Sequence, residues 1–301
     1  MKNFISKYKG PLILLLCSFL WGTTFVAQSI GSNTVGPYTF TGIRFLISGV
    51  ILFVVFLILK GKTYSLTIDK KIFSFAVLTG VALATASIFQ QIGIDKTKSA
   101  GKSAFITSLY IVFVPIFSLI LGNKIKLISL IAVAIALVGS YLIAAKGKLV
   151  FEPGDIYIFC SAIFFSFQIL LVDHASKRLD SILLCSIQFL VTGVIGTTFM
   201  FILEKPTIGA ITDSIFPILY AAIVSGCFAY LFQIIGQKTT NPTLASLIMG
   251  LEAVFAALAG IIVLKETLTP KETIGCILLF SSVVIPQINF KKKTSDNKDI
   301  L

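Results

Sequence analysis

Hydrophobic residues form long continuous runs along most of this chain, separated by short polar segments. A run of about 20 helical residues is enough to cross the hydrocarbon layer of a bilayer, which is about 30 Å thick. The runs cover residues 11–30, 37–59, 72–94, 103–122, 126–145, 154–173, 181–203, 214–236, 243–264 and 270–289. Because they are continuous and do not alternate with polar positions, they predict helices and not the strands of a barrel. We therefore expect an all-α integral membrane protein with ten transmembrane helices.

The second half of the chain repeats the first. Cys17-Ser18 returns as Cys160-Ser161, 143 residues later. At the same spacing, eight of the 24 positions between residues 81–104 and 224–247 are identical, where about two are expected by chance. The run RFLISGVI at 44–51 also aligns with QFLVTGVI at 188–195. We expect two related five-helix repeats, residues 1–148 and 149–290, followed by a basic tail, residues 291–301.

An odd number of spans in each repeat gives the second repeat the opposite orientation in the membrane, so the repeats are predicted to be inverted. With both termini inside, the cytoplasmic segments hold 16 Lys and Arg residues and the outer loops hold 8. Positively charged loops stay in the cytoplasm. This bias predicts that both termini are cytoplasmic.

The composition agrees with a membrane protein. The chain of 301 residues is 56% hydrophobic and 13% charged, with a mean hydropathy of +0.98, so a water-facing surface would have to be built largely from apolar side chains. Its formal charge of +12 is scattered over loops on both faces, which argues against a nucleic-acid partner. Lys291, Lys292 and Lys293 are expected either to contact anionic lipid or to act as a plain flank of the last span.

Residues for enzyme chemistry are scarce. His174 is the one histidine, and P-loop, GxSxG and GxGxxG motifs are missing from the sequence. The five cysteines all fall inside predicted helices without CxxC spacing. We expect no metal, no cofactor and no enzymatic activity.

Two ionisable residues fall at membrane depth, Arg44 in the second span and Glu252 in the ninth. Such residues are costly, about 2.5–3.5 kcal/mol on insertion scales, and indicate functional sites by default. Arg44 is interpreted either as a structural partner or interfacial anchor, or as a substrate contact. Glu252 is interpreted either as a structural group or as a carrier of a coupling proton, a role for which Asp95 is the second candidate.

Polar side chains also recur at helical spacing on several spans. Examples are Ser87, Gln91 and Asp95 in the third span, and Tyr230, Gln233 and Gln237 in the eighth. Such faces meet either each other, as interhelical hydrogen bonds, or a polar central cavity. For the cavity we predict substrate contacts from Trp21, Thr24, Gln28, Arg44, Ser87, Gln91, Thr107, Tyr110, Gln168, Tyr230, Gln233 and Glu252, with Phe25, Phe164 and Phe167 as possible aromatic lining.

Pro115 lies in the middle of the fourth span. Because proline removes a backbone hydrogen bond, it predicts a kink there. The equivalent position in the second repeat is Leu258, so the two repeats are not required to bend alike.

Several segments together resemble the EamA family of the drug/metabolite transporter superfamily. They are WGTTF at 21–25, RFL at 44–46, TSLYIVFVP at 107–115, LEAVFAAL at 251–258 and LKETL at 264–268. The resemblance covers nearly the whole chain and implies a ten-helix carrier of a bacterial inner membrane, usually an exporter of amino acids or other small metabolites. The chain departs from the family at Ala253, where proline is frequent, and at Asn123, where glutamate is frequent.

We therefore predict a secondary transporter that works by alternating access around a site at the repeat interface. With Arg44 as the sole cation expected in the cavity, the prediction favours a zwitterionic or neutral small-molecule substrate over a phosphorylated one. Two alternatives stay open. A membrane enzyme would require clustered catalytic groups at one face, and a passive scaffold or accessory subunit would lack an internal cavity.

Overall fold

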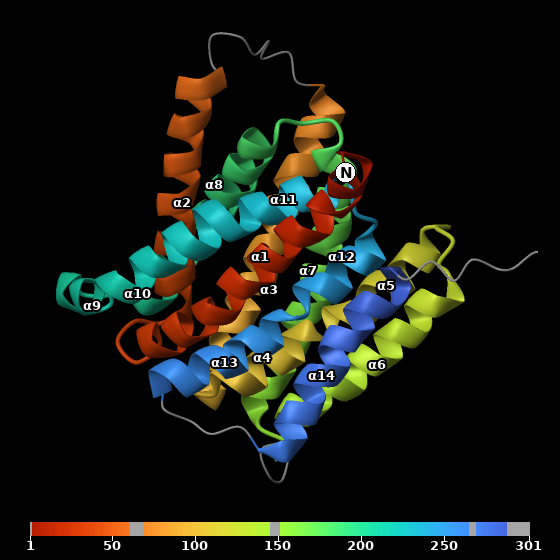
Figure 1. Ribbon diagram of the computed structural model, residues 1–301. Helices are drawn as coiled ribbons and strands as arrows, with labels where there is room; N and C mark the ends of the chain where they lie inside the picture. Colours follow the sequence, from red (N-terminus) through yellow and green to blue (C-terminus); the bar gives the residue numbers. More distant parts are fainter. Residues whose placement is uncertain (1, 61–68, 145–150, 265–268, 288–301) are drawn as a thin grey trace, which may run out of the picture.

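The computed structural model describes residues 2–60, 69–144, 151–264 and 269–287, and all elements within them are helical. Figure 1 shows these helices gathered into one bundle. The all-α prediction is confirmed for this part of the chain. The basic tail, residues 291–301, lies outside the described residues, so its contact with anionic lipid stays a prediction.

The first half of the chain forms α1 (Lys2–Gly31), α2 (Pro37–Lys60), α3 (Lys70–Thr97), α4 (Ala100–Ser108), α5 (Tyr110–Ile120) and α6 (Leu127–Ala144). The second half forms α7 (Pro153–Ser176), α8 (Ser181–Phe199), η1 (Met200–Glu204), α9 (Ile208–Asp213), α10 (Ile215–Tyr220), η2 (Ala221–Tyr230), α11 (Leu231–Gln237), α12 (Pro242–Met249), α13 (Glu252–Leu264), α14 (Pro270–Val284) and η3 (Ile285–Gln287). Here η1 and η2 are π-helical stretches and η3 is a 3₁₀ turn.

Proline marks the start of several helices because its missing N–H is not needed in the first turn. Pro37, Pro153, Pro242 and Pro270 each open a helix. Before α14, the Thr269 hydroxyl accepts a hydrogen bond from the Glu272 N–H, and the Glu272 carboxylate accepts one from the Thr269 N–H in return. These reciprocal bonds satisfy backbone donors that have no partner within the helix.

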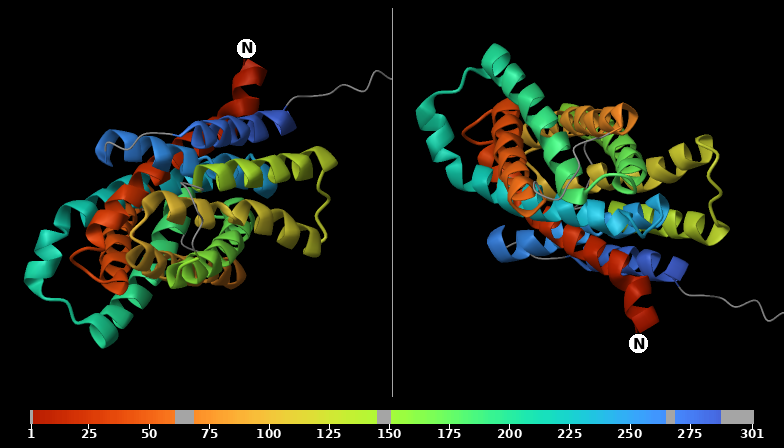
Figure 2. Two further views of the ribbon diagram at one scale, coloured as in Figure 1. Left: turned by 90° about the horizontal axis from the view of Figure 1, so that it is seen from below. Right: turned by 90° about the horizontal axis from the view of Figure 1, so that it is seen from above.

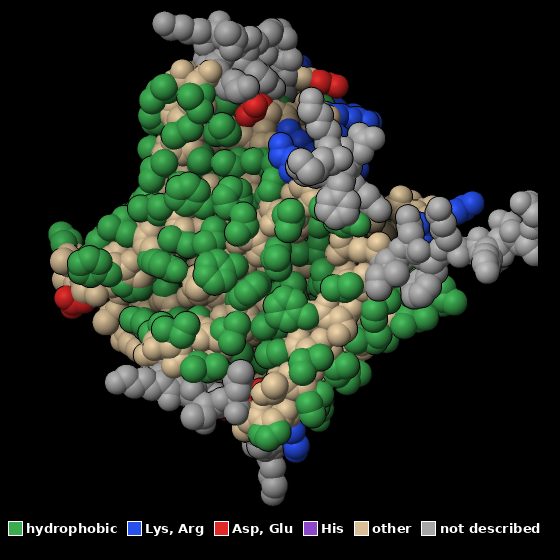
Figure 3. Space-filling view, viewed as in Figure 1, with side chains coloured by type: hydrophobic (Ala, Val, Ile, Leu, Met, Phe, Trp, Pro, Cys, Tyr) green, Lys and Arg blue, Asp and Glu red, His purple; other side chains and the backbone are tan. Residues whose placement is uncertain are grey.

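Eight helical segments in the described part of the chain are long and apolar enough to cross a membrane. They are Tyr8–Gly31, Pro37–Leu59, Lys70–Thr97, Ala100–Ile120, Pro153–Ser176, Ser181–Glu204, Ile215–Gln237 and Pro242–Val263. The remaining two predicted spans correspond to α6 and α14, which are shorter. Large apolar side chains such as Ile58, Phe216 and Ile262 are exposed on the outside, and Figure 3 shows green side chains over most of one face. The chain is a multi-pass membrane protein.

The two halves pack mainly against each other. α2 lies along α8, α3 along α7 and α6 along α14, as Figures 1 and 2 show. α1 packs against η2, α11 and α13, while α7, the first helix of the second half, packs against α3, α4 and α5. The first helix of each half therefore packs against the third and fourth predicted spans of the other half. Neither half therefore buries its apolar faces without the other.

Glycines bring the backbones of α2 and α8 into contact. A Cβ added at Gly49 would meet the Leu190 backbone at 2.9 Å, and one added at Gly193 would meet the Leu46 backbone at 2.6 Å. Leu46 and Leu190 are equivalent positions of the aligned runs, as are the two glycines, so the contact is the same from both sides. Farther along, a Cβ at Gly196 would lie 2.7 Å from the Cα of Gly42.

The fourth and ninth predicted spans are each broken near the middle. The first break separates α4 from α5 at Leu109, and the second separates α12 from α13 at Gly250 and Leu251. Pro115 lies inside α5, six residues past the break, so the break does not fall at the proline, and the kink at Pro115 stays a prediction. The break in the ninth span lies at the corresponding place and has no proline beside it. Proline is therefore not the common cause of the two breaks. The broken spans pack together, α5 against α12 and α4 against α13.

Substituting Gly196 by alanine tests the close crossing of α2 and α8. The added Cβ has no room beside the Gly42 backbone, so the helices must separate, at a cost of about 1–3 kcal/mol. We expect a lower melting temperature for the purified protein in detergent. Gly101→Ala is the matched control, because a Cβ at Gly101 meets nothing within 4 Å. Equal melting temperatures for the two variants would contradict the assigned crossing.

Candidate functional site

A small pocket lies inside the bundle, between side chains from both halves of the chain. It is lined by Trp21, Thr24, Phe25, Gln28, Arg44, Gln90, Thr107, Tyr110, Phe165, Ser225, Tyr230 and Glu252. Eight of the twelve predicted substrate contacts are among these residues. The pocket has a volume of about 30 Å³, enough for about two water molecules.

Arg44 enters this pocket from α2. Its side chain is 4% exposed, and the guanidinium carbon lies 4.6 Å from the ring centre of Phe45 and 5.4 Å from that of Phe40. These contacts stabilise the cation through the ring electrons. The Arg44 Nε has no hydrogen-bond partner, and no carboxylate of the described residues lies within 4.0 Å of the guanidinium. Arg44 is thus a buried cation without an anionic partner.

Glu252 enters from the break in the ninth span, where it is the first residue of α13. Its carboxylate faces the hydroxyl of Tyr110, the first residue of α5 at the other break. Neither Glu252 Oε1 nor the Tyr110 hydroxyl makes a hydrogen bond of good geometry with the described residues. The N-terminus of α13 favours negative charge at this position. Each broken span therefore presents its first residue after the break to the pocket.

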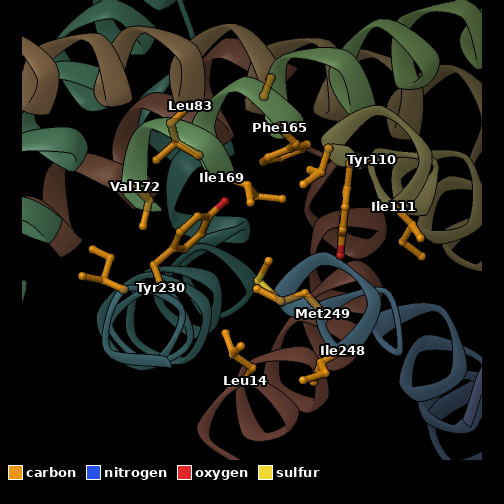
Figure 4. Packing of buried hydrophobic residues seen from close by; sticks show 14 of the residues in the cluster. Leu14, Leu83, Tyr110, Ile111, Phe165, Ile169, Val172, Tyr230, Ile248 and Met249 are labelled. Carbon is orange, nitrogen blue, oxygen red and sulfur yellow. The ribbon is translucent and has the colours of Figure 1, made fainter. Parts of the chain in front are cut away.

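Tyr230 lines the same pocket as Arg44 and Glu252. Its ring packs against Trp21, Phe189 and Phe45, with ring centres 4.8, 5.3 and 5.9 Å apart, and it interacts electrostatically with both Arg44 and Glu252. Figure 4 shows Tyr230 and Tyr110 entering the core from different helices. Arg44 and Glu252 line one pocket and do not form a salt bridge with each other.

Several other polar atoms around the pocket are buried without a hydrogen-bond partner. They include Trp21 Nε1 and Ser87 Oγ, in addition to the Arg44, Tyr110 and Glu252 atoms. Buried polar groups in proteins are normally satisfied by protein atoms, ordered water or a ligand. The pocket is therefore equipped with both donors and acceptors for a small polar molecule.

Glutamines form two amide clusters beside the pocket, one from each half. The Gln28 Nε2 donates to the Oε1 atoms of Gln90 and Gln91, at 3.0 Å in both cases. In the second half, Gln168 and Gln233 exchange hydrogen bonds of 3.3 and 3.0 Å. Gln168, Gln233, Gln91 and also Ser87 are buried but do not line the pocket. For the three glutamines, the structure favours the interhelical hydrogen bonds that the sequence left open.

Gln188 completes the second cluster, accepting a hydrogen bond of 3.2 Å from Gln168. In the aligned repeat runs, Gln188 occupies the position that Arg44 has in the first half. The charge of Arg44 therefore has no counterpart in the second half.

Asp95 lies away from the pocket. Its carboxylate accepts from the Lys98 ammonium at 2.7 Å, near the end of α3, and its side chain is 37% exposed. The structure thus separates the two candidates for a coupling proton.

The sequence analysis missed three lining residues, Gln90, Phe165 and Ser225. Gln90 and Gln91 are adjacent, so the helical period alone cannot decide which faces inward, although Gln90 is also a repeat match. Phe164 and Phe167 were expected, and Phe165 lines the pocket in their place. Ser225 lies in the π-helix η2, where the period of 3.6 residues does not hold.

An ion pair and a set of hydrogen bonds join the two halves at the starts of α4, α7 and α2. The Lys102 ammonium at the start of α4 lies 2.9 Å from the Asp155 carboxylate at the start of α7. The Glu204 carboxylate accepts from the backbone N–H groups of Tyr38 and Thr39 at 2.9 and 2.7 Å, and so caps α2 from the second half.

Known proteins of similar sequence are transporters by name. An uncharacterized transporter of Archaeoglobus fulgidus is 30% identical over 283 residues, which cover 93% of this chain and 86% of that protein. The uncharacterized inner membrane transporter YedA of Escherichia coli is 24% identical, covering 88% of this chain and 86% of its own. A solved crystal structure, 16% identical, matches with a TM-score of 0.77 over 93% of this chain and 96% of that chain, which shows a shared fold.

The sequence profile of the EamA-like transporter family matches the chain twice, over residues 8–145 and 152–286. The resemblance noted in the sequence is confirmed by these two matches, and this chain belongs to the EamA-like transporter family.

Proposed function

We propose that this protein is a secondary transporter that exports small zwitterionic metabolites such as amino acids. The observation that carries the proposal is the pair of buried ionisable side chains of opposite type, the basic Arg44 and the acidic Glu252, which line one pocket without forming a salt bridge with each other. Export, in preference to import, rests on the family resemblance.

A zwitterion would relieve the cost of both charges at once. A buried ion without a partner is unfavourable by several kcal/mol. A carboxylate placed on Arg44 and an ammonium placed on Glu252 would each form a charge-assisted hydrogen bond, and these are stronger than neutral ones. Tyr110 and the Trp21 indole N–H add further polar contacts for the ligand.

The pocket must enlarge to admit such a ligand, since its volume suffices for only about two water molecules. We propose alternating access, in which the halves rock about this site and the breaks at Leu109 and Gly250 act as hinges. Discontinuous helices of this kind form the binding sites of many secondary transporters. The contacts of Lys102 with Asp155, and of Glu204 with α2, would open during the cycle.

The same proposal includes ten transmembrane helices in two inverted repeats, residues 1–148 and 149–290, with both termini cytoplasmic. α6 and α14 would be the two shorter spans, and the exchange of packing partners between halves supports the repeat. The distribution of lysines supports the orientation. A passive scaffold is disfavoured by the central pocket, and the substitutions below distinguish it directly.

Arg44→Gln and Glu252→Gln are expected to have reciprocal effects on binding. The test uses the amino acid that most raises the melting temperature of the parent protein, with its decarboxylated amine and its deaminated acid. Arg44→Gln should weaken binding of the amino acid and the acid but spare the amine, and Glu252→Gln should weaken the amino acid and the amine. A loss of about ten- to a hundredfold corresponds to one charged hydrogen bond of about 1.5–3 kcal/mol.

Arg178→Gln is the matched control for this experiment, because Arg178 is exposed just beyond the end of α7. It removes the same side chain without touching the pocket. If all three proteins bind the three ligands equally, the pocket does not hold a zwitterion, and a scaffold role gains support.

Glu252→Gln is also expected to abolish the pH dependence of transport into proteoliposomes. A neutral amide in the pocket cannot exchange a proton, whereas a carboxylate can move between its charged and neutral forms. Asp95→Asn provides the comparison, since Asp95 is paired with Lys98 outside the pocket. Persistence of the pH dependence in Glu252→Gln, with its loss in Asp95→Asn, would assign proton coupling to Asp95.

A further inference from the structure

A second cavity opens at the end of the bundle where α5 ends and α12 begins. Its walls come from the α5–α6 connection, the last turn of α7 and the α11–α12 connection. Its volume is about 570 Å³. This lies within the range of about 300–1,000 Å³ that is typical of small-molecule sites.

The cavity is strongly basic. Lys124, Lys126, Lys177 and Lys238 line it, against a single acid, Asp173. The Asp173 carboxylate is already paired with the Lys177 ammonium at 2.8 Å. Lys124 and Lys126 are exposed and have no ion-pair partner among the described residues. Two cations, Lys124 and Lys126, are thus available to a ligand in this cavity.

Buried polar groups also line this cavity without a partner. The Ser118 hydroxyl belongs to a side chain that is 3% exposed, and Gln237 is fully buried. Gln237 donates from Nε2 to the Ile169 carbonyl at 2.9 Å, which leaves its Oε1 without a donor, and the Ser118 hydroxyl has no hydrogen-bond partner within the part of the chain that the structure describes. Positive charge on protein surfaces is common at cytoplasmic ends of spans, but buried unsatisfied groups beside it indicate a ligand or ordered water.

We infer that this cavity binds an oxyanion, a carboxylate or phosphate group, at a site separate from the central pocket. Lys124 and Lys126 hold the anion by charge, and the Ser118 hydroxyl donates a hydrogen bond to one of its oxygens. The Gln237 Oε1 accepts from a hydroxyl of the ligand or from a bound water. Tyr230 of the central pocket and Gln237 lie seven residues apart, about 10 Å along the helix, so the sites are neighbours but distinct.

The test measures the melting temperature of the full-length protein in detergent with inorganic phosphate or citrate, against chloride at equal ionic strength and pH. Both oxyanions should stabilise the parent protein by mass action. The double variant Lys124→Gln/Lys126→Gln should bind roughly tenfold more weakly, as expected for two partly exposed charge contacts. Ser118→Ala should weaken binding without abolishing it.

Lys70→Gln/Lys71→Gln is the matched control, since it removes two adjacent exposed charges at the start of α3 without touching the cavity. It should bind the oxyanions as the parent does. Arg44→Gln should also leave this binding unchanged, so failure here and failure of the central-site proposal can be told apart.

A lipid headgroup and a free metabolite present the same chemistry, and nanodiscs separate the two sources. Stabilisation by discs containing phosphatidylglycerol over discs of phosphatidylcholine alone, lost in Lys124→Gln/Lys126→Gln, would assign a headgroup. Stabilisation by the soluble oxyanions alone would assign a free metabolite. The inference is overturned if neither source stabilises the parent, or if the parent and the Lys124→Gln/Lys126→Gln variant respond equally.

Discussion

In hydrocarbon, polar groups without a partner inside the protein go unsatisfied, and this constraint governs the arrangement of the bundle. A helix can break only where other protein groups or a polar cavity receive its backbone. Both breaks, at Leu109 and at Gly250 and Leu251, lie in spans that pack against each other inside the bundle. The pocket, with Tyr110 and Glu252 at its wall, is therefore a place where the helices can be interrupted.

The interleaving of the two halves has a physical basis in the same solvent. Lipid tails are as apolar as leucine, so helices associate through close packing and hydrogen bonds rather than by leaving water. Glycines supply that close packing where α2 crosses α8, and amides supply the hydrogen bonds around Gln28 and Gln168. The amide clusters hold each half together internally, whereas the glycine contacts lie at the boundary between the halves, which is also where the pocket lies.

The sequence predicted the positions of the two buried ionisable side chains better than those of the uncharged polar side chains. Arg44 and Glu252 reach the pocket because a charge at membrane depth has few tolerable positions, whichever way the helix is turned. Amide side chains can hydrogen-bond to one another away from the pocket. The sequence pattern therefore could not separate Gln91, Gln168 and Gln233 from the residues that line the pocket. The breaks and the π-helix around Ser225 depend on contacts between distant spans, which no local rule about proline or periodicity contains.

The substitution of Gln188 for Arg44 in the second repeat makes an otherwise pseudo-symmetric core electrically polar. A molecule with separated charges would be held there in one orientation, carboxylate toward α2 and ammonium toward α13. If the halves rock as proposed, the side of the membrane that the pocket faces changes, but Arg44 and Glu252 keep their places in the pocket. Such a molecule would keep its carboxylate end toward α2 and its ammonium end toward α13 throughout the crossing, without turning over in the pocket.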